Sequence, residues 1–530
     1  MTRVRSKPLV LVALLMASFV INLDTTLVNV ALPTLTRELG ATTAQLQWVV
    51  DAYNLVFAAL LLTSGSLSDR FGRKGLLLAG LAVFGLASFA GGFATGTAGL
   101  IAARAVMGLG AAMTFPATLS LLTGVFTGRR ERALSIGLWG ATAGMAIALG
   151  PIVGGFLLGH YRWSSIFYTL GPVSLAVIVL AAWFVPAARD PRPTGLDFPG
   201  LILSGGFMGL LVYTIIEAPA RGWTSAATLL GFAGAAVLLI AFIAGERRTD
   251  RPMLDVRLFA NMRFSAASAA VTIAFFTLSG FIFLMTQYFQ FIRAYSPLST
   301  GVHLLPVAVS VAAGSTIGTR LAVRSGTKMI VTAGLVLQAG FYFWVASDLS
   351  PTLSYGIIAV QMVVYGLGMG LTSAPATESI MGAVAARQAG VGSAVNDSTR
   401  LLGGTLGVAI IGSVYASLYA ARLTTSLPAL PAALANLARQ SAGAAFGVSG
   451  QLAAHGQRAA GAAVHQAATS AFDHGLSVGC VVAAVIALAG ALLAAAFLPA
   501  QPPAPPAQPA GPDQHTERPA TASDGKDLVR

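Results

Sequence analysis

Asp24 is the first residue that demands a chemical explanation, because this carboxylate stands in the middle of a long apolar stretch. The stretch begins at about Leu9, and at ~1.5 Å of rise per residue Asp24 lies ~22 Å along a helix, inside a hydrocarbon core of ~30 Å. A charge there costs ~2.5–3.5 kcal/mol on insertion scales, so a buried acid indicates a functional site. A purely structural hydrogen bond is the alternative, but Asn or Thr would make it at lower cost.

Two stripes of residues divide this first helix. Small and apolar residues share the stripe of Asp24, namely Ala13, Ala17, Val20, Val28 and Ala31. Because a neighbouring helix can approach such a stripe closely, we expect Asp24 to face protein. Asn22, Thr26 and Asn29 form a second stripe on roughly the opposite face. This polar stripe predicts a water-filled cavity and a role in substrate binding.

A second buried charge, Arg104, lies within the fourth apolar stretch. A guanidinium keeps its charge in proteins, so at that depth it needs a carboxylate or carbonyl partner. We predict that Asp24 is this partner. Snorkelling to an interface is the alternative, and it is disfavoured because Arg104 lies inside the apolar run.

Residues at catalytic or metal-ligand spacing do not accompany these charges. The single cysteine, Cys480, lies in an apolar run and has no partner for a disulfide, metal or redox site. His455 and His465 have no acidic or Cys neighbour at ligand spacing, so we expect a flexible outer loop around them, in which the residue spacing allows an amphipathic surface helix. We therefore predict no catalytic residue, no metal site and no enzymatic activity.

Apolar helices must position these charged groups, because 55% of the 530 residues are hydrophobic and only 10% are charged. With a mean hydropathy of +0.76, the chain is predicted to be an all-α, polytopic membrane protein. Runs long enough to span a bilayer predict fourteen transmembrane helices. They lie at about 9–32, 46–67, 75–95, 98–122, 133–158, 164–185, 198–218, 226–245, 264–290, 300–321, 328–346, 354–376, 400–420 and 476–498.

The basic residues indicate how the spans are oriented. The formal charge is +13, but Lys and Arg lie in short clusters between apolar runs and leave no basic face for nucleic acid. If successive spans alternate in direction, 24 of the 32 basic residues fall on the side that holds both termini. The positive-inside rule then places both termini in the cytoplasm.

Weak internal similarity suggests two halves. The loop Arg324-Ser-Gly-Thr-Lys328 repeats the spacing of Arg70-Phe-Gly-Arg-Lys74, as expected of a duplicated unit. The Pro-rich start of the last segment cannot form a packed core. We predict six-helix halves at 1–186 and 262–498, two inserted helices within 187–261, an outer loop at 421–475 and a disordered cytoplasmic tail at 499–530.

The loop after the second span combines glycines, an acid and basic residues, namely Gly65, Asp69, Arg70, Gly72, Arg73 and Lys74. Asp69 can pair with basic groups or a helix N-terminus on the other half, and Gly72 permits a tight turn. The loop would thus serve as a conformational latch, and its basic residues also fix the topology. The pattern G-x-L-x-D-R-x-G-R-K resembles the signature between helices two and three of the major facilitator superfamily.

Span five contains a second glycine motif, formed by Gly140, Gly144, Gly150, Pro151, Gly154 and Gly155. Glycines four apart give a smooth face for tight helix contact, and Pro151 bends the helix. Generic membrane packing is the alternative. The spacing resembles the motif of the antiporter branch of the superfamily.

Together with Gln47-Trp-Val-Val-Asp51-Ala-Tyr53 and the fourteen spans, these motifs resemble the fourteen-helix drug:proton antiporters of the EmrB/QacA type over roughly residues 9–498. The resemblance implies the major facilitator fold and proton-driven export of drugs, cationic or lipophilic toxic compounds or secondary metabolites by alternating access. It implies no cofactor and a bacterial cell membrane, and we expect a monomer. Asp24 and Arg104 would couple transport to protons.

Further residues could contact the substrate. Asp51, near the outer end of span two, could attract a cation or relay protons, although interfacial acids are often only hydrated. Phe281, Gln287 and Tyr288 in span nine could line an aromatic pocket for flat apolar molecules, although such phenylalanines more often pack or face lipid. A proton-coupled importer of a small metabolite and a membrane protein without transport activity are the alternative functions.

Overall fold

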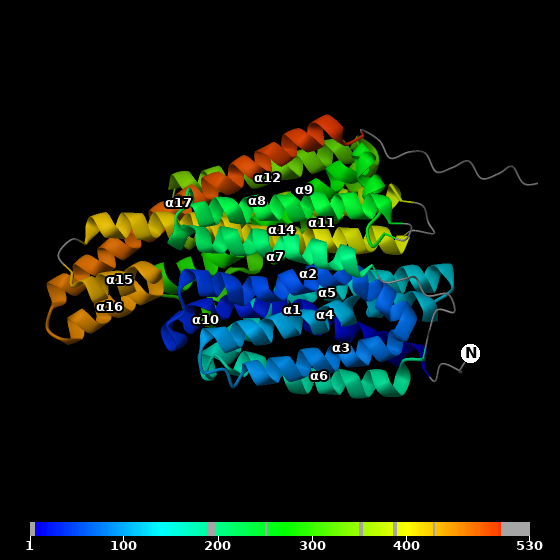
Figure 1. The fold of residues 1–530 in the computed structure, drawn as a ribbon, viewed down its shortest axis with the longest axis horizontal. Coiled ribbons are helices and arrows are strands. Elements are labelled where there is room, and N and C mark those ends of the chain that lie inside the picture. The colour runs from blue at the N-terminus through cyan, green and yellow to red at the C-terminus, as the bar shows by residue number, and fades with distance from the viewer. Residues whose placement is uncertain are drawn as a thin grey trace, which may run out of the picture.

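The structure is a computed structural model that describes residues 6–187, 197–249, 252–348, 353–384, 389–427 and 430–499. Within these ranges all regular secondary structure is helical, and fourteen helical segments are long and apolar enough to cross a membrane (Figure 1). The prediction of an all-α protein with fourteen spans is therefore confirmed. The predicted tail, from residue 500 onward, lies outside the described residues.

The helices fall into three groups along the chain. The first group is α1 (Lys7–Leu39), α2 (Thr43–Phe71), α3 (Arg73–Gly91), α4 (Thr97–Val125), α5 (Arg129–His160) and α6 (Ser165–Phe184). The second is a hairpin of α7 (Phe198–Arg221) and α8 (Ala226–Arg248), followed by η1 (Val256–Ala260). The third is α9 (Met262–Gln287), η2 (Tyr288–Ile292), α10 (Pro297–His303), α11 (Leu305–Ser325), α12 (Thr327–Asp348), α13 (Tyr355–Gly382), α14 (Ala389–Ser426), α15 (Ala432–Gln440), α16 (Ala442–Ala454) and α17 (Arg458–Phe497).

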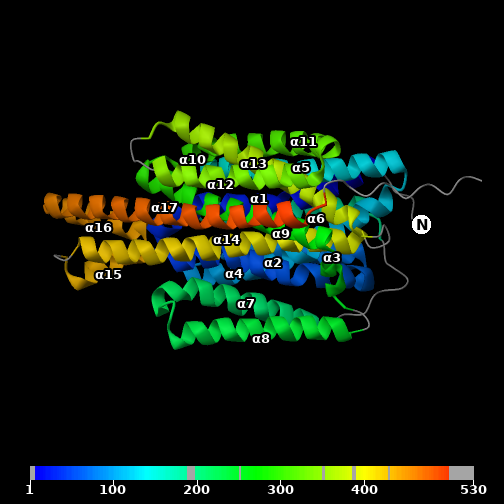
Figure 2. The same cartoon turned by 90° about the horizontal axis from the view of Figure 1, so that it is seen from above.

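Two helical bundles lie side by side, with their helices running along the length of the molecule (Figures 1 and 2). The N-terminal bundle contains α1–α6, and the C-terminal bundle contains α9–α14 and α17. The hairpin of α7 and α8 packs along one edge, against α2 and α14 (Figure 2). Following the predicted orientation, we call the end at which α1 begins the inner end and the opposite end the outer end.

Local signals set several helix ends. The α1 helix ends at Gly40, where φ is 63°, and Thr42 and Gln45 form a capping box at the start of α2. Gly72 joins α2 to α3 with φ of 97°, and Gly326 joins α11 to α12 with φ of 86°. Since glycine adopts such angles without a steric cost, the two bundles make corresponding turns in the same way.

The segment at 421–475 is largely helical, so the expectation of a flexible loop is wrong, whereas a surface helix, which the spacing allows, is present. The α14 helix continues to Ser426, α15 and α16 follow, and α17 begins at Arg458. We call α15 and α16 the outer cap, because they project at the outer end (Figure 1). The Thr43 hydroxyl donates to the Gln440 carbonyl at 3.2 Å, which joins the cap to the N-terminal bundle. The many alanines of this segment favour helix, and their small side chains pack closely.

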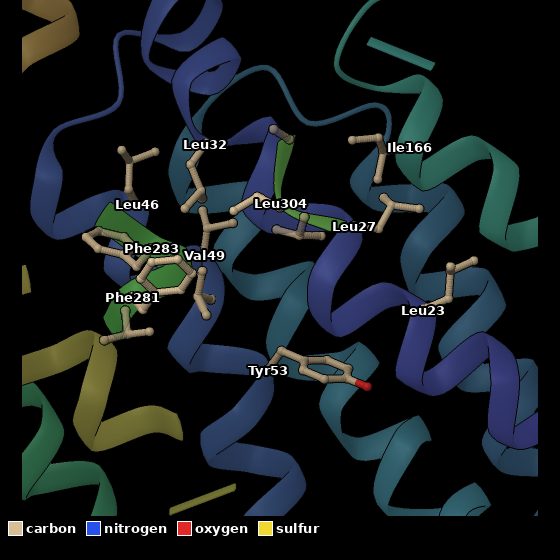
Figure 3. Packing of buried hydrophobic residues seen from close by; sticks show 14 of the residues in the cluster. Leu23, Leu27, Leu32, Leu46, Val49, Tyr53, Ile166, Phe281, Phe283 and Leu304 are labelled. Carbon is tan, nitrogen blue, oxygen red and sulfur yellow. The ribbon is translucent and has the colours of Figure 1, made fainter. Parts of the chain in front are cut away.

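Buried side chains of both bundles belong to one hydrophobic cluster. Figure 3 shows part of it, with Leu27 of α1, Val49 and Tyr53 of α2 and Phe283 of α9 in view. The charged groups of α1 and α4 are embedded in this cluster, where water cannot easily reach them.

Candidate functional site

Asp24 of α1 and Arg104 of α4 form an ion pair in the interior of the N-terminal bundle. Arg104 Nη1 lies 2.5 Å from Asp24 Oδ2, and the side chains are only 1% and 0% exposed. The predicted contact between these residues is therefore present. Asp24 faces protein, as predicted, since the other members of its stripe are also buried.

Arg104 has three further partners, one of which is Met107 Sδ at 3.9 Å from Nη1. Its Nε donates to the carbonyl of Val49 at 2.9 Å, and its guanidinium carbon lies 4.3 Å from the centre of the Tyr53 ring. The Tyr53 hydroxyl points towards α1 (Figure 3) and donates to the carbonyl of Ile21 at 3.3 Å. These contacts keep the guanidinium in place independently of the carboxylate.

Asp24 has fewer hydrogen-bond partners than Arg104. Its Oδ1 is buried and has no hydrogen-bond partner, while Oδ2 receives Arg104. A buried polar atom without a partner is costly in a membrane protein and marks a place where a proton or ligand can bind. The arrangement is therefore an ion pair with one vacant acceptor.

The second stripe of α1 does not line a cavity as a continuous surface. Thr26 packs against α5, because a Cβ on Gly150 would collide with its hydroxyl oxygen. The Asn22 side-chain amide donates to the Ser18 carbonyl of its own helix at 2.8 Å. Asn29 donates in the same way to Thr25 at 2.8 Å, but its Oδ1 is buried without a partner. Of the three, Asn29 thus keeps an unused polar atom, whereas Thr26 serves helix packing.

Asp51 is not a hydrated acid at the end of span two. Its side chain is 0% exposed, and both carboxylate oxygens are buried without a hydrogen-bond partner. It lies one turn after Gln47 on the same face of α2, and Gln47 contacts α14. On the same face of α2, Trp48 and Leu55 pack against residues of α7 and α14. Asp51 is therefore also a functional candidate, and unlike Asp24 it has no cation partner among the described residues.

The glycine motif of α5 separates into two parts. At the outer part, a Cβ on Gly154 would lie 3.0 Å from the Leu27 carbonyl of α1, and one on Gly155 would lie 2.5 Å from the Pro297 carbonyl of α10. The Pro151 carbonyl is covered by Gly301 of α10. At the inner part, Cβ atoms on Gly140 and Gly144 would meet no other atom within 4 Å. Tight packing is confirmed for the outer glycines and is absent for the inner pair.

Only part of the predicted latch lies among the residues that the structure describes. Gly72 makes the expected turn, and Lys74 Nζ donates to the carbonyl of Ala182 of α6 at 2.7 Å, within the same bundle. The surroundings of Gly65 and the side chain of Asp69 lie outside what the structure describes. Arg70 and Arg73 have interaction partners of their own.

The aromatic residues predicted in span nine lie inside the C-terminal bundle. Phe281 packs on Phe341 and Tyr365, with ring centres 5.6 and 5.1 Å away. Phe281 and Tyr288 line a small cavity between α9, α12 and α13. Gln287 does not take part, because its amide donates to the Phe283 carbonyl of its own helix at 3.1 Å.

Comparison with known proteins agrees with this geometry. The family model of the Major Facilitator Superfamily matches residues 14–408. The chain belongs to the major facilitator superfamily.

Two bacterial relatives and one solved structure are similar to this facilitator over most of its length. The multidrug resistance protein Stp of Mycobacterium tuberculosis is 35% identical over 80% of this chain and 78% of its own length. The multidrug efflux pump LfrA of Mycolicibacterium smegmatis is 34% identical over 91% and 94%. A bacterial homologue of the human lysosomal transporter Spinster shares the fold, with a TM-score of 0.67 and 18% identity over 93% of this chain and 98% of the other. This facilitator is therefore a multi-pass membrane protein of a transporter family.

Two glutamines that connect the bundles of this facilitator had no role assigned from the sequence. Gln47 of α2 donates to the carbonyls of Val408 and Ala409 of α14, at 3.1 and 2.9 Å. Gln290 of η2 donates to the Val30 carbonyl of α1 at 2.9 Å. The sequence feature that could have indicated them is an uncharged amide side chain inside an apolar span, because a buried amide needs a hydrogen-bond partner.

Proposed function

We propose that this facilitator is a proton-coupled efflux antiporter that exports drugs, cationic or lipophilic toxic compounds, or secondary metabolites. The observation that carries the proposal is the buried pair of Asp24 and Arg104, with one acceptor oxygen vacant. The functions named for the relatives, multidrug resistance and multidrug efflux, support export as the direction of transport.

During the transport cycle, the Asp24 carboxylate would bind Arg104 and a proton in turn. The carboxylate attracts Arg104, and a proton taken up from the outer side neutralises it and weakens that attraction. Arg104 then retains the Val49 carbonyl and the Tyr53 ring as partners. Release of the proton to the inner side restores the ion pair. One proton thus moves inward per cycle, which supplies ~2.3 kcal/mol per charge for each 100 mV of membrane potential.

The packing of α5 supports alternating access. Its outer glycines contact α1 and α10, whereas its inner glycines have open space around them. This asymmetry fits a state closed at the outer end, in which substrate enters from the cytoplasm and the bundles then rock to close the inner end.

Proton release from energised inside-out vesicles tests the proposal. Cationic dyes and antibiotics should release protons from vesicles with the wild-type protein, and Asp24→Asn should reduce this release to the level of vesicles without the protein. Asn has nearly the same shape but cannot ionise. Asp348→Asn, at an exposed acid that accepts from Trp344, is the matched control and should behave as wild type. Equal proton release by wild type and Asp24→Asn would refute the role of Asp24.

Asp51 is a second candidate for proton or cation binding, because both of its oxygens are buried and unpaired. Asp51→Asn should abolish the response to cationic substrates in the same vesicles if Asp51 holds the cation, and the response to neutral substrates should remain. Loss of both responses would make Asp51 a coupling acid, and no loss would exclude both roles.

We further propose that the protein works as a monomer without a cofactor in the bacterial cell membrane, with both termini in the cytoplasm. A tag on the C-terminus should then be cleaved by protease in inside-out vesicles and protected in right-side-out vesicles. The rival importer predicts uptake of substrate by whole cells in a proton gradient. Net accumulation that exceeds that of cells lacking the protein would favour import.

A further inference from the structure

Two acids of the inserted hairpin meet at its inner end, away from the Asp24 site. Asp197 immediately precedes α7, and Glu246 lies in the last turn of α8. The Glu246 side chain is only 4% exposed, and its Oε1 is buried without a partner. The proposed transport cycle does not use either residue.

The two carboxyl groups are close together. A Cβ built on Gly200 would lie 2.5 Å from Glu246 Oε1 and 2.7 Å from Asp197 Oδ2, so both oxygens border the same small space. Among the residues that the structure describes, no Lys or Arg forms an ion pair with either acid. Two ionised carboxylates at this separation would repel each other strongly in a buried site.

The helix ends and the backbone amides favour the negative charge on Asp197. Asp197 Oδ1 accepts from the Gly200 amide at 2.9 Å, at the N-terminus of α7, where a negative charge is stabilised. Glu246 lies at the C-terminal end of α8, where a negative charge is disfavoured. Three of the four carboxylate oxygens each accept a backbone N–H group, so a metal ion at this site would have to share those oxygens with amide donors.

We infer that Glu246 is a neutral carboxylic acid that donates its proton to Asp197, and that this acid pair fastens the hairpin to the segment that enters the C-terminal bundle. The Met253 amide donates to Asp197 Oδ2 at 3.4 Å, and the Leu254 amide donates to Glu246 Oε2 at 3.0 Å. The segment then continues through Asp255, which caps η1, into α9.

The acid pair also reaches the N-terminal bundle. The Thr63 hydroxyl of α2 lies 3.1 Å from Met253 Sδ, so the fastened segment contacts α2 on one side and leads to α9 on the other. Glu246 and Asp197 are therefore positioning residues for the connection between the two bundles. This inference does not depend on which compound the protein transports or on proton coupling.

Glutamine tests the inference because it imitates a protonated glutamate. In Glu246→Gln, the amide can donate to Asp197 while its oxygen still accepts from Leu254. Glu246→Ala removes both contacts, and Asp197→Asn keeps the helix cap but loses the acceptor for Glu246. Glu217→Ala is the control, since it removes a partly exposed acid of the same hairpin, 4.0 Å from Arg221.

The readout is trypsin cleavage after Arg247, Arg248 and Arg257 in inside-out vesicles, with the melting temperature of the purified protein as a second measurement. We expect Glu246→Gln and Glu217→Ala to match the wild type. Glu246→Ala and Asp197→Asn should be cleaved about tenfold faster, because a hydrogen bond to a charged group is lost and local opening becomes more frequent.

Two results would overturn the inference. If Glu246→Gln is cleaved as fast as Glu246→Ala, the glutamate is ionised. If Mg²⁺ or Ca²⁺ raises the melting temperature of the wild type but not of Glu246→Gln, the acids hold a metal ion instead of a proton. Transport assays are not needed for either decision, so a failure here is distinguishable from a failure of the proposed function.

Discussion

At the scale of single residues, the ion pair of Asp24 and Arg104 explains why both charges can stay in the membrane. Burying two charges costs several kcal/mol each in solvation, which only close contact and further hydrogen bonds offset. Arg104 obtains these from Val49 and Tyr53, whereas Asp24 depends mainly on Arg104. Loss of Arg104 is therefore expected to be more damaging to the fold than loss of Asp24.

A double-mutant cycle tests this asymmetry. Arg104→Gln should lower the free energy of unfolding by about 3–5 kcal/mol, because it leaves a buried carboxylate without a cation. Adding Asp24→Asn should restore most of this stability, since two amides can hydrogen-bond each other. Coupled export should remain absent in the double variant. Additive effects on stability would show that the two side chains do not interact.

Two substitutions of Tyr53 distinguish the role of its ring from the role of its hydroxyl. Tyr53→Phe keeps the ring beneath Arg104 and loses only the hydrogen bond to Ile21, so it should cost about 1 kcal/mol in unfolding and leave export nearly unchanged. Tyr53→Leu should lower export as well, because the cation–π contact is lost. Equal export by the two variants would mean that the ring contact with Arg104 has no role in transport.

At the scale of elements, α5 packs tightly at one end and loosely at the other. The outer glycines allow backbone contact with α1 and α10, so the two bundles close against each other there. The same helix has unfilled space around Gly140 and Gly144. If these inner glycines pack against the other bundle when the inner end closes, both parts of the motif serve transport but in different states.

Alanine substitutions distinguish these two parts of α5. Gly155→Ala should destabilise the protein by about 1–3 kcal/mol, because the new methyl group would press on the backbone of Pro297 and Leu298. Gly140→Ala has free space and should leave the melting temperature unchanged or slightly raised, because Ala favours the helix more than Gly. It should nevertheless slow export if the inner glycines close in the cycle. Unchanged export by Gly140→Ala would remove the inner pair from the mechanism.

At the scale of the whole molecule, the outer end is sealed by both bundles and by the outer cap. Gln47 and Gln290 bind backbone carbonyls across the two bundles. Gly443 of the cap lies against Thr36 of α1, since its Cβ would be 2.5 Å from Thr36 Cγ2. Release of substrate to the outside requires that these contacts separate.

A reversible cross-link tests this separation. Thr36→Cys combined with Gly443→Cys brings two thiols together, because a Cβ on Gly443 would lie 2.5 Å from Thr36 Cγ2. The native Cys480 is buried and should not interfere. Oxidation should stop export, and a reducing agent should restore it. Each single variant is the control. Export that continues after complete cross-linking would mean that the cap and α1 move together.

The sequence by itself determined the class of the protein, the number of spans and the contact between Asp24 and Arg104. These follow from hydropathy and from the cost of an unpaired charge in hydrocarbon, both of which act along one helix or between two obligatory partners. The glycine motif of α5 could also be recognised in the sequence, because only small residues let two helices approach each other closely.

The tertiary structure decided what each polar residue faces. Thr26 packs on Gly150 instead of lining a cavity, Asp51 is buried instead of hydrated, and the segment after Ser426 folds as a cap. The acid pair of Asp197 and Glu246 could not be expected either, because the two residues are 49 positions apart. Burial and pairing of this kind depend on which helices approach one another, and that packing is a property of the whole chain rather than of any one span.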